Sequence, residues 1–174
     1  MNTHTAVATY VFGCVVVLLI GLVIHRMLRG WKRRSERQAA LIGVLPDLPD
    51  RFGPAVLAPT RGLYVGSTIA PDWLERITVG DLGYRCRAVL TRYPEGILLE
   101  RSGAGPLWIP AASLIGVRIE QALAGKVIPG NSRSEAPGGL LVIRWRLPTG
   151  TEIDTGFRGD DRRHYARWTT GAAA

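Results

Sequence analysis

Cysteine and histidine are scarce in this chain of 174 residues, and their positions disfavour covalent cross-links and metal sites. The two cysteines are Cys14, inside a long apolar run, and Cys86, far along the chain in a region of mixed polarity. A disulfide needs Cα atoms within about 7 Å, so we expect none, and such a chain tolerates a reducing compartment. The three histidines, His4, His25 and His164, are too scattered to form a set of metal ligands. We therefore predict no metal and no cofactor.

Catalytic motifs are missing as well. Gly125 and Lys126 resemble part of a phosphate-binding loop, but Val127 stands where that motif requires serine or threonine. No G-x-S-x-G nucleophile motif occurs. The acidic neighbours Asp160 and Asp161 are explained by capping of a helix near the C-terminus. Since no nucleophile, base or acid pair is assembled, we expect a protein that is not an enzyme.

Acidic residues are absent from the first 35 positions, which instead contain a long uncharged run. Residues 5–24 carry no charged side chain. As a helix this run is about 30 Å long, the thickness of a bilayer's hydrocarbon core. A cleavable signal peptide has basic residues before its apolar core, whereas here they follow it. We therefore predict an uncleaved transmembrane helix.

The residues after the run set the predicted topology and membrane anchoring. They are Arg26, Arg29, Trp31, Lys32, Arg33, Arg34 and Arg37. By the positive-inside rule the N-terminus lies outside and the remaining chain in the cytoplasm, with Trp31 as an interfacial anchor. The basic cluster either sets topology alone or also binds anionic headgroups. Gly13 and Gly21 form a weak small-residue face, which leaves a homo-oligomer through the span open.

The sequence accordingly divides into four predicted segments. They are an external N-terminus (1–4), a transmembrane helix (5–28), a basic juxtamembrane helix with a proline-rich linker (29–54) and a cytoplasmic domain (55–174). Proline interrupts helices and central strands, so the three prolines between positions 45 and 54 mark the start of the domain. The net charge of +8, from 22 Lys and Arg against 14 Asp and Glu, favours association with anionic partners.

From residue 55 onward, alternating apolar residues with glycine, proline and aspartate between them predict short β-strands. The expected strands cover residues 62–68, 84–93, 97–101, 107–109, 114–120, 140–147 and 151–157. The side chains expected to share one face of their own strand are Leu63 and Val65, then Ile115, Val117 and Ile119, then Leu141, Ile143, Trp145 and Leu147, and finally Ile153 and Phe157. Between the strands we expect a single helical turn after Pro71 and a long polar loop over 122–139.

A final helix is expected after the last strand, because Tyr165 and Trp168 form an apolar stripe. Seven strands followed by one amphipathic helix is the element order of a PH-like barrel, in which the helix closes one end. The predicted fold is thus one N-terminal transmembrane α-helix and a mainly-β PH-like barrel of about seven strands closed by a C-terminal α-helix.

Several stretches resemble a family of actinobacterial single-span membrane proteins that carry a bacterial PH-like domain. They are GLYVGST (62–68), GILLER (96–101), LWIPAASLIGVR (107–118), AGKVIPG (124–130), LLVIRWRL (140–147) and DTGFR (154–158). The resemblance covers the whole chain and implies the same fold and topology. Members are often labelled as transporters or export proteins, but one span alone makes no solute pathway, and the resemblance carries over no functional residue.

The candidate contact residues are basic side chains of the predicted strands and of the long loop. They are Arg85, Arg87, Arg118, Lys126, Arg133, Arg144 and Arg146. Two interpretations stay open. Gathered on one face, these residues would bind lipid headgroups or a partner. Paired across strands with the glutamates at 95, 100, 120 and 152, they would serve stability alone.

We therefore expect a non-enzymatic, single-pass protein of the cytoplasmic membrane whose PH-like domain acts as an adaptor or scaffold. It would bind a protein partner, our first choice, or anionic lipid headgroups at the inner face of the membrane. The alternative is an accessory subunit of a transporter or of an export or envelope assembly that acts through its transmembrane helix. No nucleic-acid partner is expected, because no recognisable nucleic-acid-binding module occurs.

Overall fold

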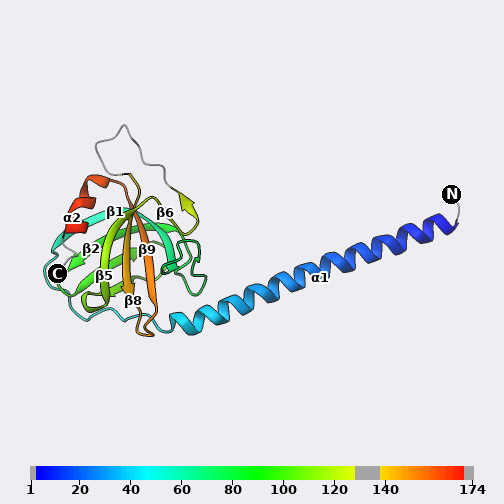
Figure 1. Cartoon of the computed structure of the whole chain (residues 1–174), viewed down its shortest axis with the longest axis horizontal. Coiled ribbons are helices and arrows are strands. Elements are labelled where there is room, and N and C mark those ends of the chain that lie inside the picture. The colour runs from blue at the N-terminus through cyan, green and yellow to red at the C-terminus, as the bar shows by residue number, and fades with distance from the viewer. Residues whose placement is uncertain (1–2, 128–137, 171–174) are drawn as a thin grey trace. The chain divides into compact units, whose positions relative to one another are not determined.

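A computed structural model describes residues 3–127 and 138–170; for residues 3–11 and 31–35 it describes the backbone. The chain forms two compact units, Met1–Arg37 and Gln38–Ala174. The first unit consists of most of helix α1 (Thr3–Ile42), coloured blue in Figure 1. In the described residues one helix, through its stretch Phe12–Gly30, is long and apolar enough to cross a membrane.

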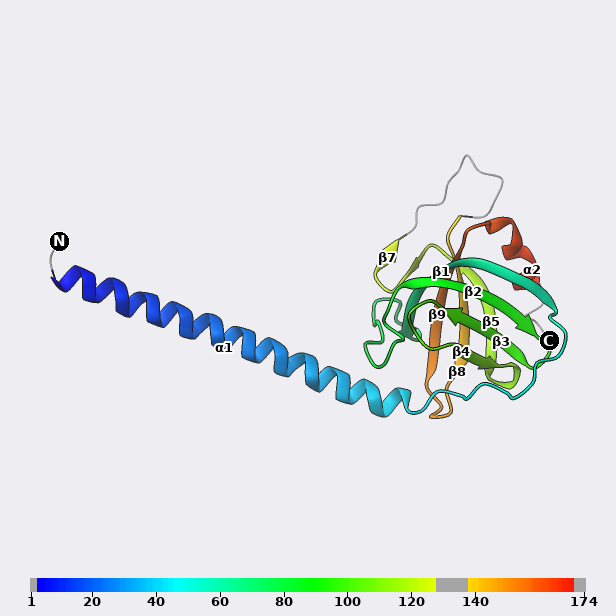
Figure 2. The same ribbon diagram turned by 180° about the vertical axis from the view of Figure 1, so that it is seen from behind.

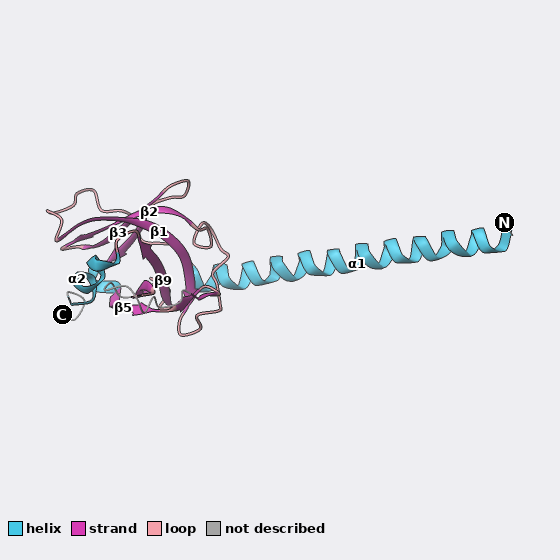
Figure 3. Ribbon diagram, turned by 90° about the horizontal axis from the view of Figure 1, so that it is seen from above, coloured by secondary structure: helices cyan, strands magenta, loops and turns pink. Residues whose placement is uncertain are grey.

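The second unit is built on a seven-stranded antiparallel sheet with the strand order β4-β3-β2-β1-β9-β8-β5. The strands are β1 (Leu57–Ile69), β2 (Cys86–Tyr93), β3 (Gly96–Arg101), β4 (Leu107–Pro110), β5 (Leu114–Glu120), β8 (Leu140–Arg146) and β9 (Glu152–Gly159). Short 3-10 turns η1 (Ala111–Ser113) and η2 (Arg162–His164) precede β5 and helix α2 (Tyr165–Thr170), respectively. Seen from behind in Figure 2 and from above in Figure 3, the sheet curves around its core. This is the predicted PH-like architecture.

The core confirms the alternation expected in β8 and β9. Trp145, Ile153 and Phe157 are fully buried, as are the other predicted inward residues of these strands. The C-terminal stripe is confirmed too, because Tyr165 and Trp168 are at most 1% exposed and pack in the same cluster. Each buried large apolar side chain contributes about 1.5–3 kcal/mol to folding, so these residues explain why α2 closes the sheet.

One of the expected strand faces is wrong, and its strand is irregular. Ile115 was expected beside Val117, but its side chain is 44% exposed. A bulge between Leu114 and Gly116 shifts the register against β8 and breaks the alternation. In β1 a similar shift follows Tyr64. Tyr64 enters the main core, whereas Leu63 and Val65 both lie outside it, Val65 in a second cluster with Leu123 and Val142. This agrees with the expectation that Leu63 and Val65 share one face.

Two connections also differ from expectation. The segment after Pro71 forms hydrogen-bonded turns instead of a helical turn. The long loop begins with a small hairpin of β6 (Ala122–Leu123) and β7 (Lys126–Val127). Leu123 of this hairpin packs over the outer face of the sheet, where Val142 is also fully buried. Gly156 permits this contact, because a Cβ there would lie 2.5 Å from the Leu123 side chain.

The last turn of α1 belongs to the second unit. Ile42 is 2% exposed and part of the core. The carbonyl of Leu41 accepts hydrogen bonds from the hydroxyls of Thr149 (2.6 Å) and Thr151 (2.9 Å) in the β8–β9 turn. Gly43, at φ +61°, ends the helix, and its N–H donates to Ala39. The chain therefore enters the domain beside the β8–β9 turn.

Candidate functional site: an arginine-rich face

The outer surface of the sheet carries a row of side chains across β2, β1 and β9. Leu63 of β1 stands opposite Arg87 of β2 and opposite Arg158 of β9. Residues that are directly opposite in antiparallel strands project from the same face. Since neighbouring strands are about 4.8 Å apart, the two arginines are separated by about 10 Å at their backbones, with Leu63 between them.

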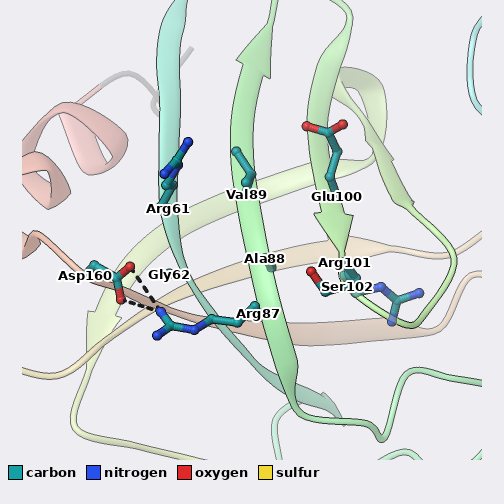
Figure 4. A pocket seen from close by; sticks show the side chains of 9 residues that line it. All are labelled: Arg61, Gly62, Arg87, Ala88, Val89, Glu100, Arg101, Ser102 and Asp160. Carbon is teal, nitrogen blue, oxygen red and sulfur yellow. Dashed lines mark hydrogen bonds and ion pairs between the residues drawn. The ribbon is translucent and has the colours of Figure 1, made fainter.

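Two further arginines extend this row. Arg61 precedes Leu63 by two residues and so shares its face, and Arg162 follows β9 in η2. We call Arg61, Arg87, Arg158 and Arg162 the arginine face. Two adjoining hollows lie on it, of about 460 and 320 Å³, and both are lined by Arg87 and Asp160. Figure 4 shows the larger hollow, with Arg61, Arg87 and Glu100 on three neighbouring strands.

The arginine face carries a net positive charge. Its four guanidinium groups oppose two exposed carboxylates, Asp160 and Glu100, which leaves +2. Arg87 pairs with Asp160 at 3.3 Å, but both side chains are more than half exposed, and such a pair contributes about 0–1 kcal/mol. In the described part of the chain, the side chains of Arg61, Arg158 and Arg162 form no ion pair or hydrogen bond. Their donors are available to an anionic ligand.

The arginine face lies far from the point where α1 joins the domain. Thr151, which bonds Leu41 of α1, directly precedes β9. Arg158 follows Glu152, the first residue of β9, by six positions, which corresponds to about 20 Å along a strand. The arginine face is therefore at the opposite end of β9 from the end of α1.

Three of the predicted contact residues form a separate, internally paired cluster. Arg118 and Arg144 both make bidentate hydrogen bonds to Asp154, at 2.8–3.1 Å and 2.7–2.9 Å. Arg118 also bonds Glu120, and Arg146 pairs with Glu152. Three arginines thus meet three carboxylates, which leaves no net charge. The contacts of these three arginines agree with the interpretation that they pair with carboxylates. Asp154 is a partner that the sequence did not suggest.

Asp154 is held ionised by its two arginines. Its side chain is 2% exposed, and burial alone would raise its pKa. The hydrogen bonds from Arg144 and Arg118 outweigh burial, so its pKa lies below the usual value of 3.8. The pKa values of both arginines are raised, chiefly by the same bonds to Asp154.

This arrangement predicts a pH-dependent stability. Because the folded-state pKa of Asp154 is lowered, its contribution is present above about pH 4 and is lost as the pH falls further. Asp154→Asn should cost about 3 kcal/mol of unfolding free energy at pH 7, since two half-buried cations lose their anion. The difference from wild type should shrink at about pH 3. Denaturant unfolding of the full chain in detergent measures both values.

Glu152→Gln is the matched control, because it removes a carboxylate from a more exposed pair and should cost less than about 1 kcal/mol. If the loss of unfolding free energy in Asp154→Asn stayed the same from pH 7 to about pH 3, the assignment of a lowered pKa to Asp154 would be contradicted.

The remaining predicted residues are dispersed. Arg85 and Lys126 are exposed, Lys126 on β7 of the small hairpin. Arg133 lies outside the described residues, as do the side chains of the juxtamembrane residues 31–35. Among the predicted contact residues that the structure describes, Arg87 alone lies on the arginine face. The sequence analysis missed Arg61, Arg158 and Arg162. They become neighbours only when segments that are distant in the sequence pack together, and the sequence does not show that packing.

A buried arginine forms the inner edge of the larger hollow and was also missed. The Arg101 side chain is 1% exposed and pairs with Asp81 at 2.7 Å. It also donates to the carbonyl of Gly105 and lies 5.1 Å above the ring of Tyr64. Burial raises the pKa of Tyr64 to about 12, and its hydroxyl donates to the Leu82 carbonyl. These contacts fix the loops at this end of the sheet.

The final turn supports the predicted capping in part. The carboxylate of Asp161 accepts hydrogen bonds from the N–H and the guanidinium of Arg163. These bonds lower the pKa of Asp161 to about 2. Asp160 does not cap η2, since it pairs with Arg87. Within the described residues no cluster of three or more histidine, cysteine or acidic side chains is placed to hold a metal.

The domain is a curved seven-stranded antiparallel sheet that packs with a C-terminal helix, and an apolar helix precedes it in the sequence. These features define a PH-like protein. The chain belongs to the bacterial PH domain-like family, whose sequence model matches residues 42–173. The match begins with Ile42, the α1 residue that is buried in the core. No curated protein matches the chain.

Proposed function

We propose that this protein is a non-enzymatic, single-pass membrane adaptor whose arginine face binds an acidic segment of a protein partner. The observation that carries the proposal is the group of Arg61, Arg158 and Arg162, whose side chains form no ion pair with any residue that the structure describes and which lie at the end of β9 remote from α1. Complementary charge of this kind mainly increases association rate and specificity. Leu63, half-buried between Arg87 and Arg158, offers a central apolar contact.

The proposed location is the cytoplasmic membrane of an actinobacterial-type cell, with the N-terminus outside. The apolar stretch Phe12–Gly30 of α1 is long enough for one crossing, and the basic residues that follow favour the cytoplasmic side for the domain. In this topology the partner is a cytoplasmic protein or the cytoplasmic part of a membrane protein.

Anionic lipid headgroups are the competing ligand of the arginine face. Like an acidic protein segment, these headgroups carry the negative charge that the arginine face attracts. A distance of about 20 Å along β9 separates Arg158 from the residues next to α1, which favours a ligand in solution over the lipids around the protein's own anchor. The internal pairing of Arg118 and Arg144 also removes the cations that a lipid-binding face would have used.

A second candidate function uses the span. The side chains of Phe12–Gly30 have no burial within the chain, and Gly13 and Gly21 have open space around them. A partner helix in the membrane could therefore cover this surface, as in an accessory subunit of a transporter or export assembly. In that case the arginine face would contribute nothing to assembly.

The test is site-specific photo-crosslinking in living cells, with a photoreactive amino acid in place of Leu63. The proposal expects a protein adduct at this position. A lipid adduct without a protein adduct would assign the face to headgroups, and adducts obtained from α1 alone would favour the accessory subunit.

A further inference from the structure

Two adjacent apolar side chains are exposed in the loop between β1 and β2. Trp73 is 40% exposed and Leu74 is 59% exposed. By contrast, Trp108, Trp145 and Trp168 of the same unit are at most 5% exposed. We call residues 70–76 the Trp73 loop. An exposed tryptophan next to an exposed leucine forms an apolar patch, and such patches mark sites of contact with other molecules or with membranes.

The backbone of the Trp73 loop is tied at several points. The Asp72 carboxylate accepts a hydrogen bond from the Leu74 N–H at 2.8 Å. The N–H of Ile69 donates to the carbonyl of Glu75 at 3.0 Å. The guanidinium of Arg76 is occupied by the carbonyls of Val65 and Gly83. These hydrogen bonds fix the backbone of the Trp73 loop, from which the side chains of Trp73 and Leu74 project outward.

The Trp73 loop adjoins the last turn of α1. The side-chain amide of Gln38 donates to the carbonyl of Arg76 at 3.2 Å. Its oxygen accepts from the N–H and the hydroxyl of Thr78 at 2.9 and 2.8 Å. Gln38 is 3% exposed. The Trp73 loop is therefore on the side of the domain that receives α1, in contrast to the arginine face.

Chain connectivity limits how far Gln38 can lie from the end of the candidate span. The apolar stretch ends at Gly30, eight residues before Gln38. Eight residues reach at most about 28 Å even when fully extended, whatever path they take. Tryptophan is enriched at membrane interfaces because its ring is apolar and its N–H finds a polar partner there.

We propose that Trp73 and Leu74 insert into the interfacial layer of the bilayer beside the protein's own anchor. This inference rests on the proposed membrane anchoring and adds a second membrane contact to it. The charges of the loop specify the kind of surface. Asp72 and Glu75 are exposed, while the Arg76 guanidinium is bound within the domain. Insertion is thus driven by apolar contact with the interface and not by attraction to anionic lipid.

The experiment uses the full chain, labelled with 5-fluorotryptophan and reconstituted in zwitterionic nanodiscs with a lipid that carries a nitroxide at headgroup depth. Each ¹⁹F resonance is assigned by a single tryptophan-to-phenylalanine substitution. We expect the Trp73 signal, and that of Trp31 beside the span, to be broadened by the nitroxide. The buried Trp108, Trp145 and Trp168 should be affected much less.

Leu74→Asp provides the matched variant, because it adds a charge at the tip and keeps Trp73. It should reduce the broadening of Trp73 at least about twofold and leave Trp31 unchanged. Addition of anionic lipid should not increase the Trp73 effect, since the loop itself is acidic. Thermal unfolding of the variant confirms that the domain is intact.

The outcomes separate this inference from the proposed anchoring. Broadening of Trp31 without Trp73 would overturn the insertion of the loop and leave the anchor in place. If neither signal is broadened, both proposals fail. A Trp73 signal that responds to protein concentration instead of the nitroxide would assign the loop to a second copy of the chain and would also overturn the inference.

Discussion

Reversal of Arg87 and Arg158 to glutamate together is expected to reduce recovery of the bound partner at least about tenfold, the equivalent of 1.4 kcal/mol. The two residues flank Leu63 on the arginine face, and each reversal places like charge against an acidic ligand, which is strongly unfavourable. Both side chains are exposed, so the melting temperature should change little. The measurement is co-purification of the partner with full-length protein from solubilised membranes at low salt.

The matched control is Arg51→Glu with Lys126→Glu. Both residues are exposed and lie outside the arginine face, and the double variant changes the net charge by the same amount. It should retain partner recovery within about twofold, because distant exposed charges are largely screened. Equal losses in the two double variants would show that net charge, and not the arginine face, determines binding.

Asp81→Asn is expected to destabilise the domain by about 3 kcal/mol, because it leaves the buried Arg101 cation without its anion. The Arg101 side chain is 1% exposed, and Asp81 is its ion-pair partner at 2.7 Å. The same carboxylate also accepts the N–H of Gly105 at 2.8 Å. Thermal unfolding should show a decrease in Tm of roughly 10 °C for a domain of this size.

Asp160→Asn serves as the comparison for Asp81→Asn. It removes the carboxylate from an exposed pair with Arg87 and should cost less than about 1 kcal/mol. If Asp81→Asn were equally mild, the carbonyls around Arg101 would suffice to stabilise its charge, and the pair would not be a main support of this end of the sheet.

The sequence predicts those strands well in which one face is buried and the pairing is regular. Leu141, Ile143 and Trp145 of β8 are buried at every second position, so period two is visible in the sequence. Where the β6–β7 hairpin covers the outer face, Leu140 and Val142 are buried as well. No local sequence pattern predicts that the hairpin covers this face. The bulge at Ile115 was not predicted either, because it too has no local sequence pattern.

The candidate site was predicted less well than the fold, because it depends on register between distant segments. Arg61, Arg87 and Arg158 come from three strands, and the sequence does not reveal which residues stand opposite one another. The pairing interpretation expected glutamates as partners of Arg118 and Arg144. Arg118 does bond Glu120, but both arginines converge on Asp154. Alternation could have suggested that Arg158, next to the buried Phe157, points outward. Its proximity to Arg87 could not be inferred.

Photo-crosslinking from position 63 in living cells tests the central claim most directly, because Leu63 lies between Arg87 and Arg158. The account predicts a discrete protein adduct that contains an acidic segment and that disappears when Arg87 and Arg158 are reversed to glutamate. Position 115, which is exposed on β5, should not yield this adduct. A position-63 adduct made up of lipid alone, or a protein adduct unaffected by the reversal, would contradict the account.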